Sequence, residues 1–100
     1  MNNKIMTNHD HSLKEVIEEL LKVYRLDSKL EEVNLVNSWE KVVGKMIANH
    51  TENIKVVNRV LYVKVDSSAL RHELHMERSK ILKKLNKKVG KKVIDEIILR

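Results

Sequence analysis

The chain has 100 residues, enough for one compact domain with its own core and too few for two. Apolar residues make up 42% of it and charged residues 34%, a globular composition; because Phe is absent, the core must be mainly Leu, Ile and Val. The absence of cysteine excludes a disulfide framework, a cysteine zinc site and a thiol nucleophile. We expect a disordered tail over residues 1–11 and a single domain over residues 12–100.

Charge is distributed unevenly along the chain. The formal net charge is +6, and residues 1–50 hold 7 Lys or Arg against 8 Asp or Glu, while residues 51–100 hold 13 against 6. This asymmetry predicts a polyanionic partner for the second half. The polar N-terminus lacks the apolar stretch of a signal peptide, and no apolar run approaches membrane-spanning length, so we expect a cytoplasmic protein, associated with the nucleoid if the polyanion is DNA.

The first predicted element is an amphipathic helix from Ser12 to about Arg25. Ser12 and Glu15 have the spacing of a capping box, in which each side chain accepts a hydrogen bond from the backbone of the other. Apolar residues then recur at helical spacing along one stripe, which we expect to lie on a core. The stripe consists of Leu13, Val16, Ile17, Leu20, Leu21 and Tyr24.

A second helix is predicted from a cap at Asp27 or Ser28 to about His50, with a kink near Asn34. Trp39 lies on its apolar stripe and is expected in the core.

The sequence period changes from 3.6 to 2 over residues 53–66, which predicts a β-hairpin. A two-residue turn at Asn58 and Arg59 pairs Val57 with Val60 and fixes the rest of the register. Arg59 is unfavourable there, because a type I′ turn requires positive φ at both positions. One strand face is then apolar, and the other carries Lys55, Tyr62 and Lys64.

Two more helices and a strand complete the predicted order. Helical spacing runs through residues 68–89 with a break at residues 75–78, Gly90 is a C-cap candidate, and residues 93–100 read as a strand. The inward residues of that strand are Ile97 and Leu99.

Without the first helix, this order is that of a type II K-homology-like domain. The predicted fold class is therefore α+β, with a three-stranded sheet backed by helices on one face and an additional N-terminal helix. Several short segments carry a narrower resemblance, to the DciA family, in their order and spacing from about Leu13 to Arg100. They are WEKVVG at 39–44, HT at 50–51, VLYVKVDSSALRHEL at 60–74, ILKKLN at 81–86 and DEIILR at 95–100.

Members of the DciA family are known as loaders or operators of the bacterial replicative helicase. The resemblance implies a replication accessory protein that binds this helicase and, weakly and without sequence specificity, single-stranded DNA, with no cofactor. Two departures bear on what the resemblance implies. This sequence stops at Arg100, without the basic or disordered extension that helps many members engage DNA, which weakens the expectation of full loading activity. Residues 75–80 lack the GxxG with which K-homology domains clamp nucleic acid, which argues against the usual K-homology mode of RNA binding. A general RNA- or ribosome-associated K-homology-like module is the alternative.

The candidate nucleic-acid contacts are mainly lysines of the last helix. On a helical wheel, Ile81, Leu82, Leu85 and Val89 occupy one side and the lysines the other. Glu77 is the only acid among residues 76–92, against eight Lys or Arg, so few i,i+4 pairs neutralise the row. The row is either a solvated face or a phosphate contact. The candidate residues are Lys80, Lys83, Lys84, Lys87, Lys88, Lys91 and Lys92, together with Lys55, Tyr62 and Lys64 on the hairpin. Tyr62 either stacks on a base or is an ordinary cross-strand residue.

Other chemistry finds little support in the sequence. His72 and His75 do not form the HExxH pattern of metalloproteases, and no ligand set completes a metal site. Ser67 and Ser68 follow a strand and open a helix, which is typical of helix caps. The chain has only two glycines and no ATP-binding phosphate loop. We therefore expect a binding protein that is not an enzyme.

Overall fold

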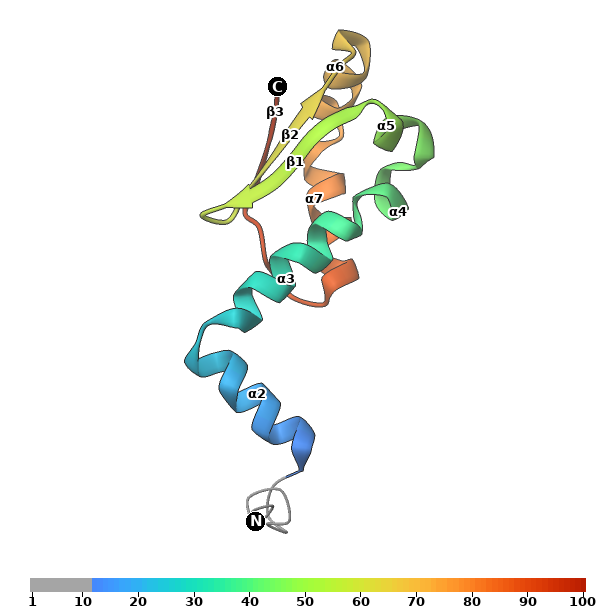
Figure 1. Ribbon diagram of the computed structural model, residues 1–100. Helices are drawn as coiled ribbons and strands as arrows, with labels where there is room; N and C mark the ends of the chain where they lie inside the picture. The colour runs from blue at the N-terminus through green and yellow to red at the C-terminus, as the bar shows by residue number, and fades with distance from the viewer. Residues whose placement is uncertain (1–11) are drawn as a thin grey trace. The chain divides into compact units, whose positions relative to one another are not determined.

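The computed structural model describes residues 12–100 (Figure 1). The predicted disordered tail, residues 1–11, lies outside the described residues. The chain divides into two compact units, the first ending at Leu30 and the second extending from Glu31 to Arg100. The single domain expected over residues 12–100 stays a prediction.

The N-terminal unit contains α2 (Leu13–Val23), which begins at the predicted capping box. The Glu15 N–H donates to Ser12 Oγ and the Ser12 N–H donates to Glu15 Oε1, both at 3.1 Å. None of the α2 residues is buried, so the expectation that its apolar stripe lies on a core is wrong. Tyr24, also expected to be at least partly buried, is 68% exposed. A unit this short holds too few apolar residues to enclose one face of a helix.

The next helix, α3 (Leu26–Asn37), begins just before the predicted caps at Asp27 and Ser28. Arg25, between α2 and α3, has a φ of 58°, a left-handed backbone conformation that interrupts the helix. The Asp27 carboxylate accepts a hydrogen bond from the Ser28 N–H at 2.9 Å, within the first turn of the helix.

The single helix predicted to continue to about His50 is wrong, because the structure contains two breaks. After α3 the chain turns at Ser38 into α4 (Trp39–Val43), and after Gly44 it continues as α5 (Lys45–Asn49). Gly44 has φ 93° and ψ 164°, a conformation that glycine adopts readily and that ends one helix before the next begins. The kink predicted near Asn34 is wrong, because α3 continues through that residue. The first break comes at Ser38, whose hydroxyl donates to the Asn34 carbonyl at 2.8 Å.

The hairpin forms as predicted from β1 (Thr51–Val57) and β2 (Val60–Val65). The strands are antiparallel with the predicted register from Val57 opposite Val60 onward. Asn58 and Arg59 have φ values of 50° and 67°, as a type I′ turn requires. A bulge near the start of β1 is the irregularity that the sequence did not predict.

The remaining elements follow the predicted order. Glu77 separates helix α6 (Ser68–Met76) from α7 (Arg78–Val89), so the predicted break is confirmed. Gly90 ends α7 in the left-handed conformation, also as predicted. The last strand, β3 (Glu96–Leu99), is shorter than the predicted one.

The three strands form one mixed sheet in the order β1-β2-β3, with β2 antiparallel to β1 and parallel to β3. In the unit from Glu31 onward, helices α4 to α7 lie on one side of the sheet, whose other side carries no helix (Figure 1). This arrangement confirms the α+β, K-homology-like prediction.

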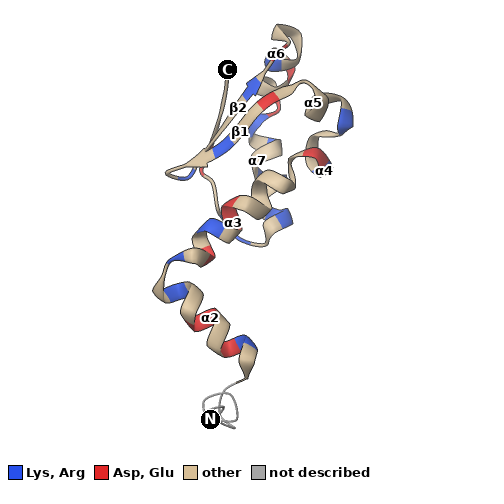
Figure 2. Cartoon of the chain, in the orientation of Figure 1, with Lys and Arg blue, Asp and Glu red and all other residues tan. Residues whose placement is uncertain are grey.

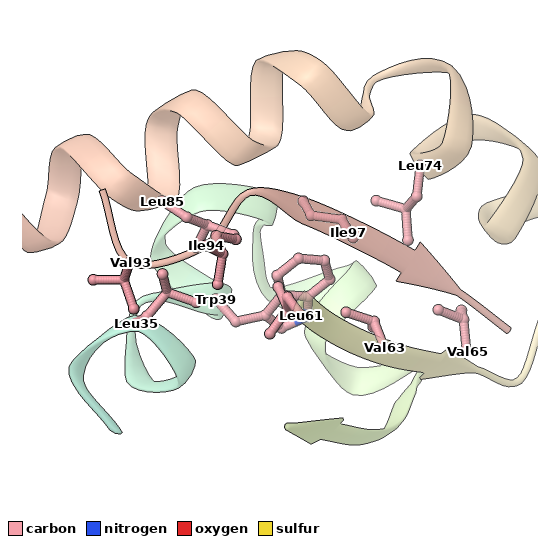
Figure 3. Packing of buried hydrophobic residues seen from close by; sticks show 10 residues of the cluster. All are labelled: Leu35, Trp39, Leu61, Val63, Val65, Leu74, Leu85, Val93, Ile94 and Ile97. Carbon is pink, nitrogen blue, oxygen red and sulfur yellow. The ribbon is translucent and has the colours of Figure 1, made fainter. Parts of the chain in front are cut away.

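The core lies between the sheet and these helices (Figure 3). Trp39 is 4% exposed, as predicted, and its Nε1–H donates to Thr51 Oγ1 at 3.0 Å. The Thr51 hydroxyl donates in turn to the Ile47 carbonyl at 2.9 Å, so the polar atom of the indole is satisfied. The buried core residues are Leu35, Trp39, Leu61, Val63, Val65, Leu74, Leu85, Val93, Ile94 and Ile97.

Asn86 of α7 fixes the segment that leads into β3. Its Oδ1 accepts hydrogen bonds from the N–H groups of Val93 at 2.9 Å and Ile94 at 3.1 Å, and its Nδ2 donates to the Ile94 carbonyl at 2.9 Å. Val93 and Ile94 are both buried. One side chain therefore satisfies the backbone of a buried non-regular segment, which holds β3 beside β2.

Candidate nucleic-acid interface

The lysines of α7 point away from the core because the helix is amphipathic. Leu85 is fully buried, and Ile81, Leu82 and Val89 are partly buried against the core cluster. The lysines on the other side of the helix are exposed, as the helical wheel predicted. They are Lys80, Lys83, Lys84, Lys87 and Lys88, followed by Lys91 and Lys92 after the helix ends.

Three of these seven lysines have carboxylate partners. Lys80 Nζ lies 3.4 Å from Glu77 Oε1, Lys91 Nζ 3.1 Å from Glu31 Oε2, and Lys92 Nζ 3.8 Å from Asp95 Oδ1. Glu77 is the only acid among residues 76–92, and the sequence does not indicate the pair with Glu31, which is distant along the chain. The remaining four have no carboxylate within 4.0 Å in the described part of the chain; they are Lys83, Lys84, Lys87 and Lys88.

A hollow between α4 and α7 collects three of the unpaired lysines. Lys84, Lys87 and Lys88 line it together with Lys41 and Val42 of α4, and its volume is about 460 Å³. Sequence reasoning missed Lys41; the helical pattern indicates that this residue faces away from Trp39, but only the packing of α4 on α7 brings it to the lysine row. We call Lys41, Lys84, Lys87 and Lys88 the α4–α7 lysine surface.

The three candidate residues of the hairpin lie on the side of the sheet that carries no helix. Lys55 and Tyr62 are opposite each other in the register, and Lys64 Nζ lies 3.7 Å from Glu52 Oε1. The Arg100 guanidinium carbon lies 5.0 Å from the centroid of the Tyr62 ring. Together with Asn53 these residues line a shallow hollow of about 370 Å³. We call Asn53, Lys55, Tyr62, Lys64 and Arg100 the sheet-face cluster.

The structure does not bring the two groups of predicted residues into one site. The sheet-face cluster lies on the helix-free side of the sheet, whereas the α4–α7 lysine surface is formed by exposed residues of two helices that pack on the other side (Figure 1; Lys and Arg are blue in Figure 2). The core lies between the sheet and these helices. Sequence reasoning also missed Asn53 and Arg100. Period-2 alternation is the signal that could have assigned both to the outer face, but joining Arg100 to Tyr62 requires knowing that β3 lies beside β2.

The turn between α6 and α7 occupies the place where K-homology domains carry their GxxG clamp. Here it holds Glu77, with φ −99° and ψ 9°, and its carboxylate is paired with Lys80. Residues 75–80 contain no glycine, so the glycine-based backbone clamp of K-homology domains is not formed at this turn.

The described residues hold no cluster of metal-ligating side chains. Residues 12–100 contain no group of three His, Cys, Asp or Glu side chains that could hold a metal ion. Ser67 is a helix cap, since its hydroxyl accepts a hydrogen bond from the Leu70 N–H at 3.3 Å. Each helix in the described part of the chain is too short or too polar to span a bilayer.

The chain is similar in sequence to known proteins. It matches the model of the family described as "Dna[CI] antecedent, DciA" over residues 12–99. It is also similar to a protein of Corynebacterium glutamicum (strain R) named "UPF0232 protein", with 33% identity over 63 residues, which are 63% of this chain and 35% of the relative. The match thus spans about a third of the relative's length. The family match covers nearly all of the chain, which therefore belongs to the DciA family.

Proposed function

We propose that this chain is an accessory protein of bacterial DNA replication, which binds the replicative helicase and holds single-stranded DNA beside it during loading. Membership of the DciA family supports the helicase partner, because members of this family act as helicase loaders or operators. The α4–α7 lysine surface supports the DNA partner. Both activities are exerted in the cytoplasm, at the chromosome.

The observation that carries the DNA contact is the unopposed charge between α4 and α7. Four lysines approach one hollow, and none of them has a carboxylate within 4.0 Å among residues 12–100. Like charges held together repel one another, whereas a phosphate backbone in the hollow converts the repulsion into attraction. A nearby set of paired lysines, at positions 80, 91 and 92, shows that this helix region does use counter-charges elsewhere.

Binding through these residues is independent of base sequence. A lysine ammonium is a point charge that contacts phosphate oxygens, and it does not read base edges as a bidentate arginine does. This fits a protein that must act wherever a helicase is loaded.

The chain contributes binding and carries out no reaction of its own. Its sequence has no ATP-binding phosphate loop. Energy for loading then comes from the nucleotide cycle of the helicase, and the accessory protein acts by binding one helicase state more tightly than another.

We place the helicase contact on the apolar stripe of α2. Leu13, Ile17 and Leu20 are 55%, 47% and 52% exposed, and contiguous exposed apolar residues are typical of protein interfaces. Ile17→Asp is expected to abolish capture of the same organism's helicase in a pull-down and to leave DNA binding unchanged. Glu18→Ala, on the polar side of α2, is the control and is expected to retain capture.

The function itself is tested with the purified chain and the same organism's helicase. The chain is expected to capture the helicase and to increase its loading onto a closed single-stranded DNA circle. If it does neither, the proposal fails, and the general RNA- or ribosome-associated module becomes the better hypothesis. Crosslinking in cells that recovers structured RNA and no replication proteins leads to the same conclusion.

A further inference from the structure

The sheet-face cluster owes its composition to the register of all three strands. Lys55 of β1 is opposite Tyr62 of β2, and Tyr62 is opposite Ile98 of β3. The next outward-facing row contains Asn53, Lys64 and Arg100. The first row takes one residue from each strand, and the second takes one from β1, one from β2 and Arg100, which directly follows β3. The two rows together form a platform with one aromatic ring and three cations.

Arg100 is held in this platform by its backbone. Its N–H donates to the Val63 carbonyl at 2.9 Å, and its carbonyl accepts from the Val65 N–H at 2.8 Å. Because side chains alternate along a strand and Ile97 is buried, these hydrogen bonds direct Arg100 to the outer face beside Lys64. The side of the sheet on which the Arg100 side chain lies is therefore set by the sheet.

We propose that the sheet-face cluster binds a nucleoside monophosphate unit, with the base stacked on Tyr62 and the phosphate held by Arg100 and Lys55. The same chemistry is offered by a free nucleotide and by a nucleotide within a single strand. The site extends the proposed function with a second contact, on the opposite side of the sheet from the α4–α7 lysine surface, and does not depend on that surface.

The aromatic part of the site is the outer face of Tyr62. The ring is half-buried on the sheet, and the Arg100 guanidinium lies over it, 5.0 Å from its centroid. A cation over an exposed ring is held weakly, and a nucleobase stacks on an aromatic side chain more strongly. A base is therefore expected to take the place of the guanidinium, which then turns toward the phosphate.

The charges of the cluster favour an anion. Lys55 and Arg100 have no carboxylate within 4.0 Å among the described residues, and Lys64 has Glu52 at 3.7 Å, with both side chains about half exposed. The Asn53 side chain adds a donor and an acceptor that can meet a base edge. The hollow of about 370 Å³ is in the size range of small-ligand sites, although it is shallow.

The test is an NMR titration of the isotope-labelled chain with deoxyadenosine 5′-monophosphate, deoxyadenosine and inorganic phosphate. The monophosphate is expected to shift amide signals of β1, β2 and Arg100 and to bind at least fivefold more tightly than either of its parts. Shifts confined to α7, or equal binding of the monophosphate and inorganic phosphate, would overturn the proposal.

Variants separate stacking from charge. Tyr62→Leu is expected to weaken monophosphate binding at least fivefold, whereas Tyr62→Phe is expected to retain it. Arg100→Gln, an exposed change that leaves the fold intact, is expected to weaken monophosphate binding to a similar extent. Equal binding by Tyr62→Leu and Tyr62→Phe rejects the stacking site. Lys84→Gln with Lys87→Gln is the control and is expected to leave monophosphate binding unchanged, even though it weakens binding of a long single strand.

A final arm identifies the source of the nucleotide. A deoxyadenosine tetranucleotide that binds at least tenfold more tightly than the monophosphate, with the same dependence on Tyr62, assigns the site to single strands. Equal affinity of the two assigns it to free nucleotide. If the tetranucleotide binds without dependence on Tyr62, the proposal is rejected, and the α4–α7 lysine surface is left as the DNA contact of the proposed function.

Discussion

Arg59, in the hairpin turn, and Asp95, before β3, form a two-pronged salt bridge. Arg59 Nε donates to Asp95 Oδ2 at 2.8 Å and Nη2 donates to Oδ1 at 3.0 Å, while the same Nη2 also donates to the Lys92 carbonyl at 3.0 Å. The Asp95 N–H donates in turn to the Arg59 carbonyl at 2.8 Å. A turn residue with unfavourable backbone geometry is thereby attached to the segment that positions β3.

The first prediction concerns pH. The hydrogen bond from Arg59 lowers the pKa of the Asp95 carboxyl below its ordinary value, with the nearby Lys92 charge adding to the effect. A carboxyl whose pKa is lowered by folding stabilises the protein above its unfolded-state pKa, about 3.9, and that stabilisation is lost as the pH falls through the folded-state value. The difference in Tm between the wild type and Asp95→Asn is therefore expected to be small at pH 7 and to disappear once the pH falls below the lowered, folded-state pKa of Asp95. A difference that grows on acidification would contradict this account.

The second prediction concerns salt. Each lysine that contacts a phosphate of single-stranded DNA contributes about −0.7 to the slope of log K against log salt, and four or five contacts give roughly −3. Replacing Lys84, Lys87 and Lys88 with Gln is expected to bring the slope to roughly −1, measured by fluorescence anisotropy with a labelled oligonucleotide.

The structure supplies a matched control for this triple variant. Lys80, Lys91 and Lys92 belong to the same region, but each already has a carboxylate partner. Replacing these three with Gln changes the net charge equally and is expected to alter the slope much less. If both triple variants lose equal affinity, general electrostatic attraction explains the binding, and the α4–α7 lysine surface is not a defined contact.

The third prediction concerns Asn86. Asn86→Ala removes three hydrogen bonds from a buried backbone segment, so the free energy of unfolding is expected to fall by about 3 kcal/mol, at about 1 kcal/mol for each bond. Asn86→Asp keeps the acceptor for Val93 and Ile94 and loses the single donor, so a smaller loss is expected. Urea denaturation measures both, and an Ala variant as stable as the Asp variant would show that the segment does not rely on the side chain.

The fourth prediction concerns the indole of Trp39. Thr51→Val preserves the shape of the side chain but leaves the Trp39 Nε1–H, in a residue only 4% exposed, without its acceptor. The expected loss is about 1–3 kcal/mol of unfolding free energy, the usual cost of an unsatisfied buried polar group. Thr51→Ser retains the hydroxyl and serves as the control. It is expected to lose clearly less in the same denaturation experiment, and equal losses would point to packing of the Thr51 methyl group.

The local features of this protein were determined by the sequence. The capping box at Ser12, the hairpin register around Asn58, the helix break at Glu77 and the cap at Gly90 all follow from interactions among residues close in the chain. The amphipathic pattern of α7 likewise established which side its lysines occupy. Short-range sterics and periodicity are sufficient for such features.

Only the tertiary structure decided which of these segments lie beside one another. The sequence pattern of α2 predicted a buried stripe, yet burial requires a partner surface, and none of its residues is buried. The pairing of Lys91 with Glu31, the addition of Lys41 to the lysine row and the placement of Arg100 over Tyr62 each join residues far apart in sequence. Such neighbours are set by how strands and helices pack, and periodicity along one segment carries no information about the segment beside it.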